Sequence, residues 1–159
     1  MVDEGPDIGL LASKVIVEPA CVLDHPDGAH TVYFTYENVS SSKLSVETNP
    51  ATGAVNEMVA SGRQLAPFTE FEPGRHVGEV AVTFTGSALT WRVKAAGCEA
   101  SSAQVDARTS RCKPIKPLAT CAKKVVDRRL ALVGYENPNP HALSVPVGSL
   151  NKLSPGAPD

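Results

Sequence analysis

Residues 80–93 read VAVTFTGSALTWRV and contain the clearest strand signal in the chain. Apolar and polar side chains alternate on both sides of a Thr-Gly-Ser turn, which is typical of two half-buried β-strands. The alternating apolar residues are Val80, Val82, Phe84, Leu89, Trp91 and Val93. The pattern predicts two strands that pair as a hairpin, and it places Trp91, the single tryptophan, in a core rather than against a ligand.

Shorter strand signals precede this stretch. Apolar or β-branched residues gather at 14–23, 32–36, 44–46 and 68–71, with turn-forming sequences between them. The one stretch compatible with a helix, residues 99–111, is polar and without an apolar stripe, and it is interpreted as part of a linker. Roughly seven short strands with turns at intervals of about 8 to 12 residues indicate an all-β, immunoglobulin-like β-sandwich.

Part of the chain occurs twice. Tyr-Glu-Asn at 36–38 and Leu-Ser-Val at 44–46 recur together 99 positions later, at 135–137 and 143–145. The sequence around Cys21 recurs around Cys121 with a one-residue slip, as a changed turn length between two strands would produce. A period of this size corresponds to a duplicated domain rather than to a solenoid unit.

The duplication divides the chain into four predicted parts. These are an N-terminal extension (1–14), a complete sandwich (15–98), a linker (99–116) and the first half of a second copy (117–159). The second copy lacks a counterpart of residues 68–98, which leaves an apolar face and strand edges open to water. A small sheet of this kind is not expected to be stable alone. The chain can be a piece of a longer protein, the half-domain can dock on the first copy, or another subunit can supply the missing strands.

Charge is distributed unevenly between the two copies. Residues 1–107 carry 6 Lys or Arg and 14 Asp or Glu, whereas residues 108–159 carry 9 and 3. An acidic body with a basic tail favours head-to-tail contact between copies, and such a contact forms a filament when it does not close. The alternative is that both surfaces are simply solvated. Nucleic-acid binding is disfavoured because the tail lacks interleaved aromatic residues. The predicted assembly residues are Ala131, Val133, Tyr135, Leu143, Val145, Lys123, Lys124, Arg128 and Arg129.

The four cysteines predict disulfides. Cys21, Cys98, Cys112 and Cys121 contain no C-x-x-C pair, which argues against a zinc or thioredoxin-type site. Three connectivities are open to four cysteines. We expect Cys21 to pair with Cys98 across the sandwich and Cys112 to pair with Cys121. Four free thiols in a cytosolic protein are the alternative.

The two copies also share a longer pattern with a known domain. Copy two contains Gly134-Tyr135-Glu136-Asn137, Val145-Pro146-Val147-Gly148, Asn151 and Ser154-Pro155-Gly156. Copy one contains Phe71, Pro73-Gly74-Arg75 and Leu89-Thr90-Trp91, and it departs from the pattern at Val46-Glu47-Thr48. Together these motifs resemble a repeated immunoglobulin-like domain of exported bacterial proteins. The resemblance implies an extracellular or cell-surface location and brings neither a catalytic motif nor an established ligand.

Catalytic and metal-binding patterns are poor. The sequence has no Gly-rich phosphate loop, no G-x-S-x-G elbow and no H-E-x-x-H motif. His25 and His30, with Asp24 and Asp27, come nearest to a metal cluster, but they lie in a predicted turn. No apolar run approaches the roughly 18 residues that span a bilayer. We therefore expect neither enzyme activity nor a cofactor, metal or membrane span.

Two functions are compatible with these expectations. The first is a structural subunit of an extracellular fibre that self-associates through its incomplete copy. The second is a fragment of a cell-surface adhesin or of a module that binds carbohydrate or protein.

Overall fold

The computed structural model describes residues 14–145, and within them the chain forms eleven β-strands and no helix. The strands are β1 (Val15–Asp24), β2 (Ala29–Asn38), β3 (Leu44–Ser45), β4 (Val55–Ala60), β5 (Arg63–Leu65), β6 (Glu70–Phe71), β7 (Gly74–Thr85), β8 (Leu89–Lys94), β9 (Ser101–Val105), β10 (Lys116–Val125) and β11 (Arg128–Glu136). The predicted all-β class is confirmed.

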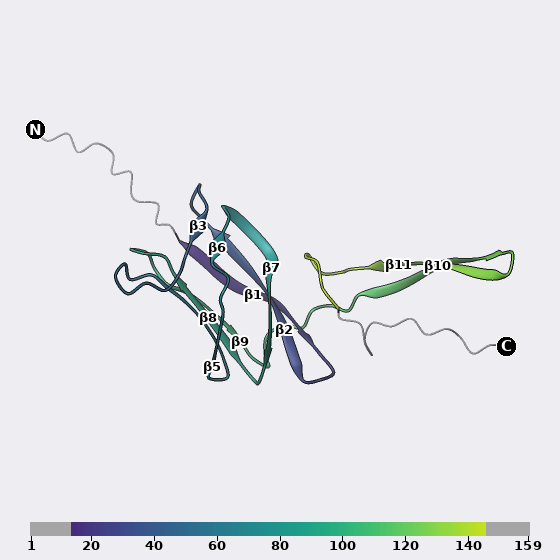
Figure 1. Cartoon of the computed structure of the whole chain (residues 1–159), viewed down its shortest axis with the longest axis horizontal. Coiled ribbons are helices and arrows are strands. Elements are labelled where there is room, and N and C mark those ends of the chain that lie inside the picture. Colours follow the sequence, from purple (N-terminus) through teal and green to yellow (C-terminus); the bar gives the residue numbers. More distant parts are fainter. Residues whose placement is uncertain (1–13, 146–159) are drawn as a thin grey trace, which may run out of the picture.

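Nine of these strands form a β-sandwich (Figure 1). One antiparallel sheet has the order β1-β2-β7, the other has the order β5-β4-β8-β9, and the short strands β3 and β6 pair beside them. The sheets share one core because alternate side chains of each point inward. Phe34 and Trp91 meet there edge to face, with ring centroids 5.1 Å apart. Trp91 is fully buried, as its place in the sequence predicts.

The strands β7 and β8, on either side of residues 86–88, do not form the predicted hairpin. β7 pairs with β2, and β8 pairs with β4 and β9, so the chain crosses from one sheet to the other. Alternation reports which face of a strand is buried but not which strand lies beside it. The prediction of a hairpin was wrong for this reason.

Residues 99–116, predicted to be a linker, include a strand of the sandwich. They contain β9, which pairs with β8 and buries Ala103 and Val105 in the core. Only two of the five side chains of β9 are buried, so the apolar pattern is too short to indicate a strand. The stretch therefore resembles a polar linker in the sequence.

The cysteine pairing also differs from the prediction. Cys21 forms a disulfide with Cys112, and Cys98 and Cys121 are free. The segment at Cys112 lies beside β1, where Val22 donates its N–H to Ser110 O and accepts from Cys112 N, both at 2.9 Å. Cys98 follows β8 near Lys14, which forms an ion pair with Glu99. The rise per residue of a strand places Lys14 roughly 20 Å from Cys21 along β1. Cys98, which lies near Lys14, is therefore too far from Cys21 to form a disulfide with it.

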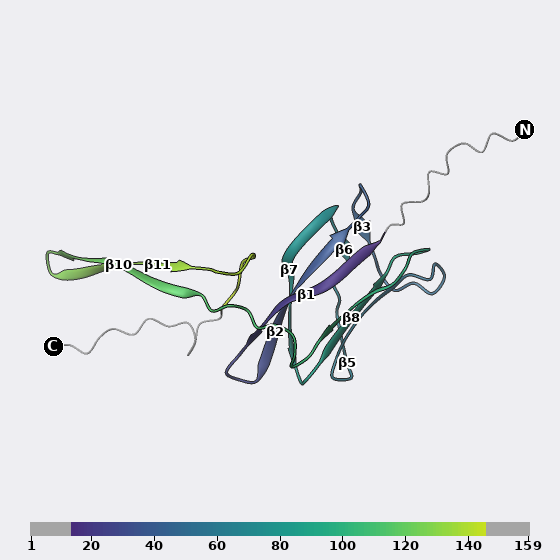
Figure 2. The ribbon, with the colours of Figure 1, turned by 180° about the vertical axis from the view of Figure 1, so that it is seen from behind.

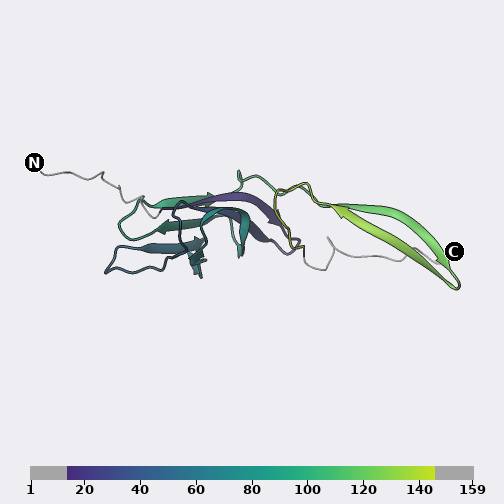
Figure 3. The ribbon, with the colours of Figure 1, turned by 90° about the horizontal axis from the view of Figure 1, so that it is seen from above.

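Strands β10 and β11 form a separate antiparallel hairpin. The hairpin extends away from the sandwich in each of three views (Figures 1, 2 and 3). Every residue of both strands is exposed. Among residues 14–145, therefore, nothing covers the hairpin β10–β11.

Candidate assembly surface

The hairpin β10–β11 repeats the strand register of β1–β2. Val22 faces Val32 in the first pair, and Ala122 faces Ala131 in the second. Both pairs also have an irregularity at the same place, between Pro19 and Cys21 and between Ala119 and Cys121. Equivalent residues are 100 positions apart in the first strand and 99 apart in the second, so the one-residue slip lies in the turn.

The two hairpins end in the same side-chain hydrogen bonds. Asn38 donates from Nδ2 to Ser42 O at 2.9 Å, and Asn137 donates from Nδ2 to His141 O at 2.8 Å. In the sandwich, Asn38 Nδ2 also donates to Phe71 O at 2.9 Å. Within the described residues Asn137 has no counterpart of this second bond from Asn38. Within residues 14–145 the local structure is therefore repeated, whereas the strands that enclose it are not.

Both faces of β11 are apolar and open to solvent. Ala131, Val133 and Tyr135 correspond in register to Val32, Phe34 and Tyr36, which are buried in the core of the sandwich. Val133 is 57% exposed and Tyr135 is 73% exposed. On the opposite face, Leu130 and Leu132 are 61% and 58% exposed. Large exposed apolar side chains gathered on a strand with one open edge are typical of a contact surface.

The tip of the hairpin is basic. Lys124 lies directly opposite Arg129, and the exposed residues Lys123 and Arg128 flank this pair. Like charges opposite each other destabilise an antiparallel ladder. Asp127, in the turn, is the only acidic residue between them. An acidic partner surface would relieve this repulsion.

The predicted assembly residues Leu143 and Val145 are not part of this exposed surface. They are half-buried beside the sandwich, where Ser144 donates its N–H to the Tyr33 hydroxyl at 2.9 Å. The rings of Tyr33 and His141 also lie 5.0 Å apart. Residues 141–145 thus attach the base of the hairpin to the outer face of the sheet β1-β2-β7. Sequence reasoning missed this contact because its partners are more than 100 residues apart.

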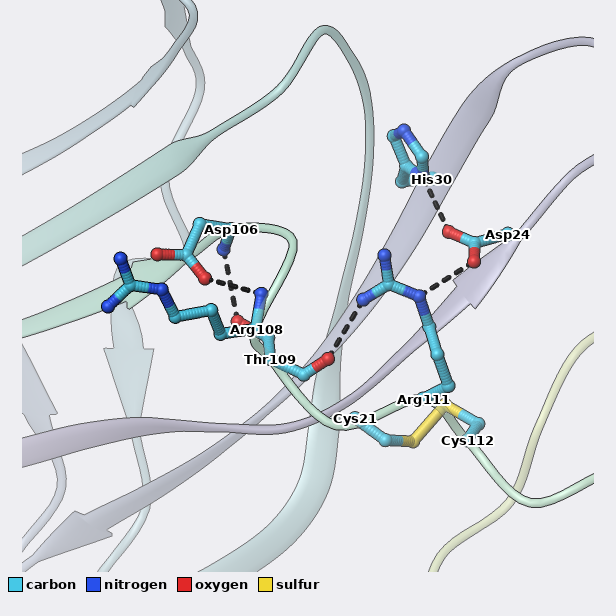
Figure 4. A network of polar contacts seen from close by, with 8 residues as sticks. All are labelled: Cys21, Asp24, His30, Asp106, Arg108, Thr109, Arg111 and Cys112. Carbon is cyan, nitrogen blue, oxygen red and sulfur yellow. Dashed lines mark hydrogen bonds and ion pairs between the residues drawn. A yellow bond between two sulfur atoms is a disulfide. The ribbon is translucent and has the colours of Figure 1, made fainter.

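A second set of contacts, next to the Cys21–Cys112 disulfide, attaches the segment before the hairpin to the sandwich (Figure 4). Arg111 donates from Nε to Asp24 Oδ2 at 2.7 Å, and His30 Nδ1 lies 2.6 Å from Asp24 Oδ1. Partial burial raises the pKa of Asp24, but hydrogen bonds to His30 and Arg111 and the charge of Arg111 outweigh this effect and lower it overall. The network ties β1 to the segment that leads into the hairpin.

Asp24 and His30, two of the residues that resemble a metal cluster, belong to this network, and the other two make separate local contacts. His25 Nε2 lies 2.7 Å from Thr31 Oγ1, and Asp27 accepts the N–H of Ala29. In the part of the chain that the structure describes, no three His, Cys, Asp or Glu side chains are grouped for a metal ion. Over the same residues, no helix is long and apolar enough to cross a membrane.

Comparisons with protein-family models, with curated proteins and with solved structures find no match for this chain.

Proposed function

We propose that this chain is a non-enzymatic structural subunit of an extracellular or cell-surface assembly, built on immunoglobulin-like repeats. Its hairpin β10–β11 joins one copy to the next, head to tail, by adding its strands to the neighbour. The observation that carries the proposal is the register shared by β10–β11 and β1–β2. The strands β1–β2 are enclosed by the sandwich, whereas the strands β10–β11, with the same register, are exposed.

Burial of apolar side chains favours a contact at the hairpin but does not by itself outweigh the free-energy cost of association. Complete burial of one large apolar side chain contributes about 1.5–3 kcal/mol, so the two large apolar side chains on one face of β11 contribute roughly 3–6 kcal/mol. Association costs about 4–15 kcal/mol in lost freedom of motion. Apolar burial alone therefore offsets only part of this cost, and hydrogen bonds at the strand edge must add to it.

Charge provides a further contribution in the same direction. The basic tip belongs to a tail of net positive charge, and residues 1–107 have a net negative charge. Contact between the tail of one copy and the body of another brings opposite charges together. Attraction between exposed charges is screened beyond about 8 Å at physiological ionic strength, so the assembly should weaken with salt.

Electron microscopy and sedimentation velocity of the purified chain test this proposal. The full-length chain at high concentration and low salt should form polymers. A variant with residues 118–134 replaced by a short Gly-Ser turn should stay monomeric, because it keeps the Cys21–Cys112 disulfide but loses the exposed strands. Val59→Asp, at a 37% exposed position on the sandwich, is the matched control and should still polymerise. A monomeric full-length chain under these conditions would overturn the proposal.

One observation favours a second function. The strands that enclose β1–β2 come from the same chain, at residues 70–105. Strands of a longer chain could enclose β10–β11 in the same way, which would make this chain part of a cell-surface adhesin or binding module. That function predicts a monomer whose hairpin is protected from proteolysis only when the further strands are present.

A further inference from the structure

The folded sandwich limits which surface of a neighbouring copy could accept the hairpin. In another copy, the strands that would enclose β10–β11 by analogy with β1–β2 are already paired, and Trp91 of β8 is fully buried. Releasing these strands would expose the core. An acceptor must therefore be a surface that the folded sandwich leaves open.

The outer edge of β7 meets this condition. Within residues 14–145, β7 pairs only with β2, and it lies at the end of the sheet β1-β2-β7. Val22 directs its backbone groups away from β2, toward Ser110 and Cys112. Val22 lies opposite Val32 of β2, and Val32 lies opposite Val82 of β7. Because Val22 directs its backbone groups away from β2, Val32 directs its groups toward β7, and Val82 directs its groups toward β2. Backbone groups alternate in direction along an antiparallel strand. The N–H groups of Ala81 and Thr83, on either side of Val82, consequently face outward.

A cleft lies beside this edge. The opposing sheet ends in β5, which has only three residues and leaves the space next to β7 uncovered. The cleft has a volume of about 470 Å³, and its lining includes Leu65 of β5 and Phe84 of β7. Apolar side chains of an added strand could therefore reach the rim of the core.

We propose that β11 of one copy adds antiparallel to the outer edge of β7 in another copy and covers this cleft with Leu130 and Leu132. By the alternation described for β1–β2, the backbone groups of Ala131 and Val133 face away from β10. Pairing them with Ala81 and Thr83 puts the side chains of all four residues on the outer face. Leu130 and Leu132 then lie on the same face as Phe84, above the cleft.

This inference rests on the proposed function and assigns its acceptor. The enlarged sheet has the order β1-β2-β7-β11-β10, with the last two strands from the neighbouring copy. No strand of the folded sandwich is displaced. Each copy provides one hairpin and one β7 edge, so the contact can repeat along a filament.

Two pairs of variants test the inference in the full chain, with the dissociation constant of assembly measured by sedimentation. Ala81→Pro removes an outward N–H that β2 does not use, and it should weaken assembly roughly tenfold. Ala81→Thr keeps the N–H and should have little effect. Leu132→Ser should weaken assembly at least tenfold, and the neighbouring Val133→Ser, at a position of similar exposure, less than threefold.

The outcomes separate the acceptor from the proposed function. Assembly that persists in the full chain but is insensitive to Ala81→Pro would overturn the β7 acceptor and leave strand-mediated assembly in place. A greater loss with Val133→Ser than with Leu132→Ser would overturn the antiparallel arrangement over the cleft. Absence of any assembly would overturn both proposals together. Circular dichroism of each variant checks that the sandwich still folds.

Discussion

Cys21 is covalently joined to Cys112 across 91 residues of sequence, so the disulfide encloses almost the whole sandwich. The bond fixes the segment that follows β9 against β1, next to the ion pair between Asp24 and Arg111. The base of the hairpin is therefore held to the sandwich even though the hairpin itself is exposed. A fixed base is what an element that transmits a contact between copies requires.

Loss of this disulfide should destabilise the sandwich. Because the bond closes a long loop, Cys112→Ser should lower the free energy of unfolding by about 2–5 kcal/mol. Urea denaturation followed by Trp91 fluorescence measures the change. Cys121→Ser is the matched control, because Cys121 is exposed and unpaired, and it should shift the midpoint little. Equal effects of the two substitutions would contradict a structural role for the Cys21–Cys112 bond.

The sequence predicted the faces of the strands better than their partners. Alternation at Val80–Phe84 and Leu89–Val93 identified two inward faces, and Trp91 is buried as predicted. Strand pairing depends on the whole topology, which a local pattern does not contain, so the predicted hairpin and the predicted Cys21–Cys98 bond were wrong. The exposed face of β11 followed from the repeat.

Burial of Tyr33 illustrates why the rest of the surface could not be predicted. Tyr33 points away from the core, where an aromatic residue is normally half-exposed, yet it is only 3% exposed. Two of the residues that contact it are His141 and Ser144, more than 100 positions later. No periodicity connects positions so far apart in the sequence.

The contact at Tyr33 should control the segment 141–145 without controlling the sandwich. Tyr33→Phe removes the hydroxyl that accepts the Ser144 N–H, a bond worth about 1 kcal/mol. Hydrogen exchange at Ser144 should become several-fold faster, while the core amides of β8 should be unchanged. Equal exchange rates in both proteins would show that the hydroxyl does not hold the segment.

A buried asparagine should be among the most sensitive polar positions. Asn56 is 4% exposed, accepts the indole N–H of Trp91 at 2.9 Å and donates to the carbonyl oxygens of Val46 and Phe68. Asn56→Ala leaves all three groups without this partner and should cost about 3 kcal/mol or more in urea denaturation. Gln104→Ala, at an exposed position on β9, is the control and should cost less than about 0.5 kcal/mol. A cost for Asn56→Ala as small as that of the control would contradict the role of these bonds.

The attachment at Asp24 should weaken in acid. The hydrogen bonds to His30 and Arg111 keep the pKa of this carboxyl below its usual 3.8, so its stabilising contribution is complete above pH 3.8 and is lost as the pH falls through the lower folded value. The side chain is 48% exposed, so the contribution should be no more than about 1 kcal/mol. The difference in unfolding free energy between the native chain and Asp24→Asn should shrink as the pH falls from 5 through 4 and below. A difference that grows with acidity would mean that the folded carboxyl binds protons more tightly than the unfolded one, opposite to the direction that the Arg111 contact implies.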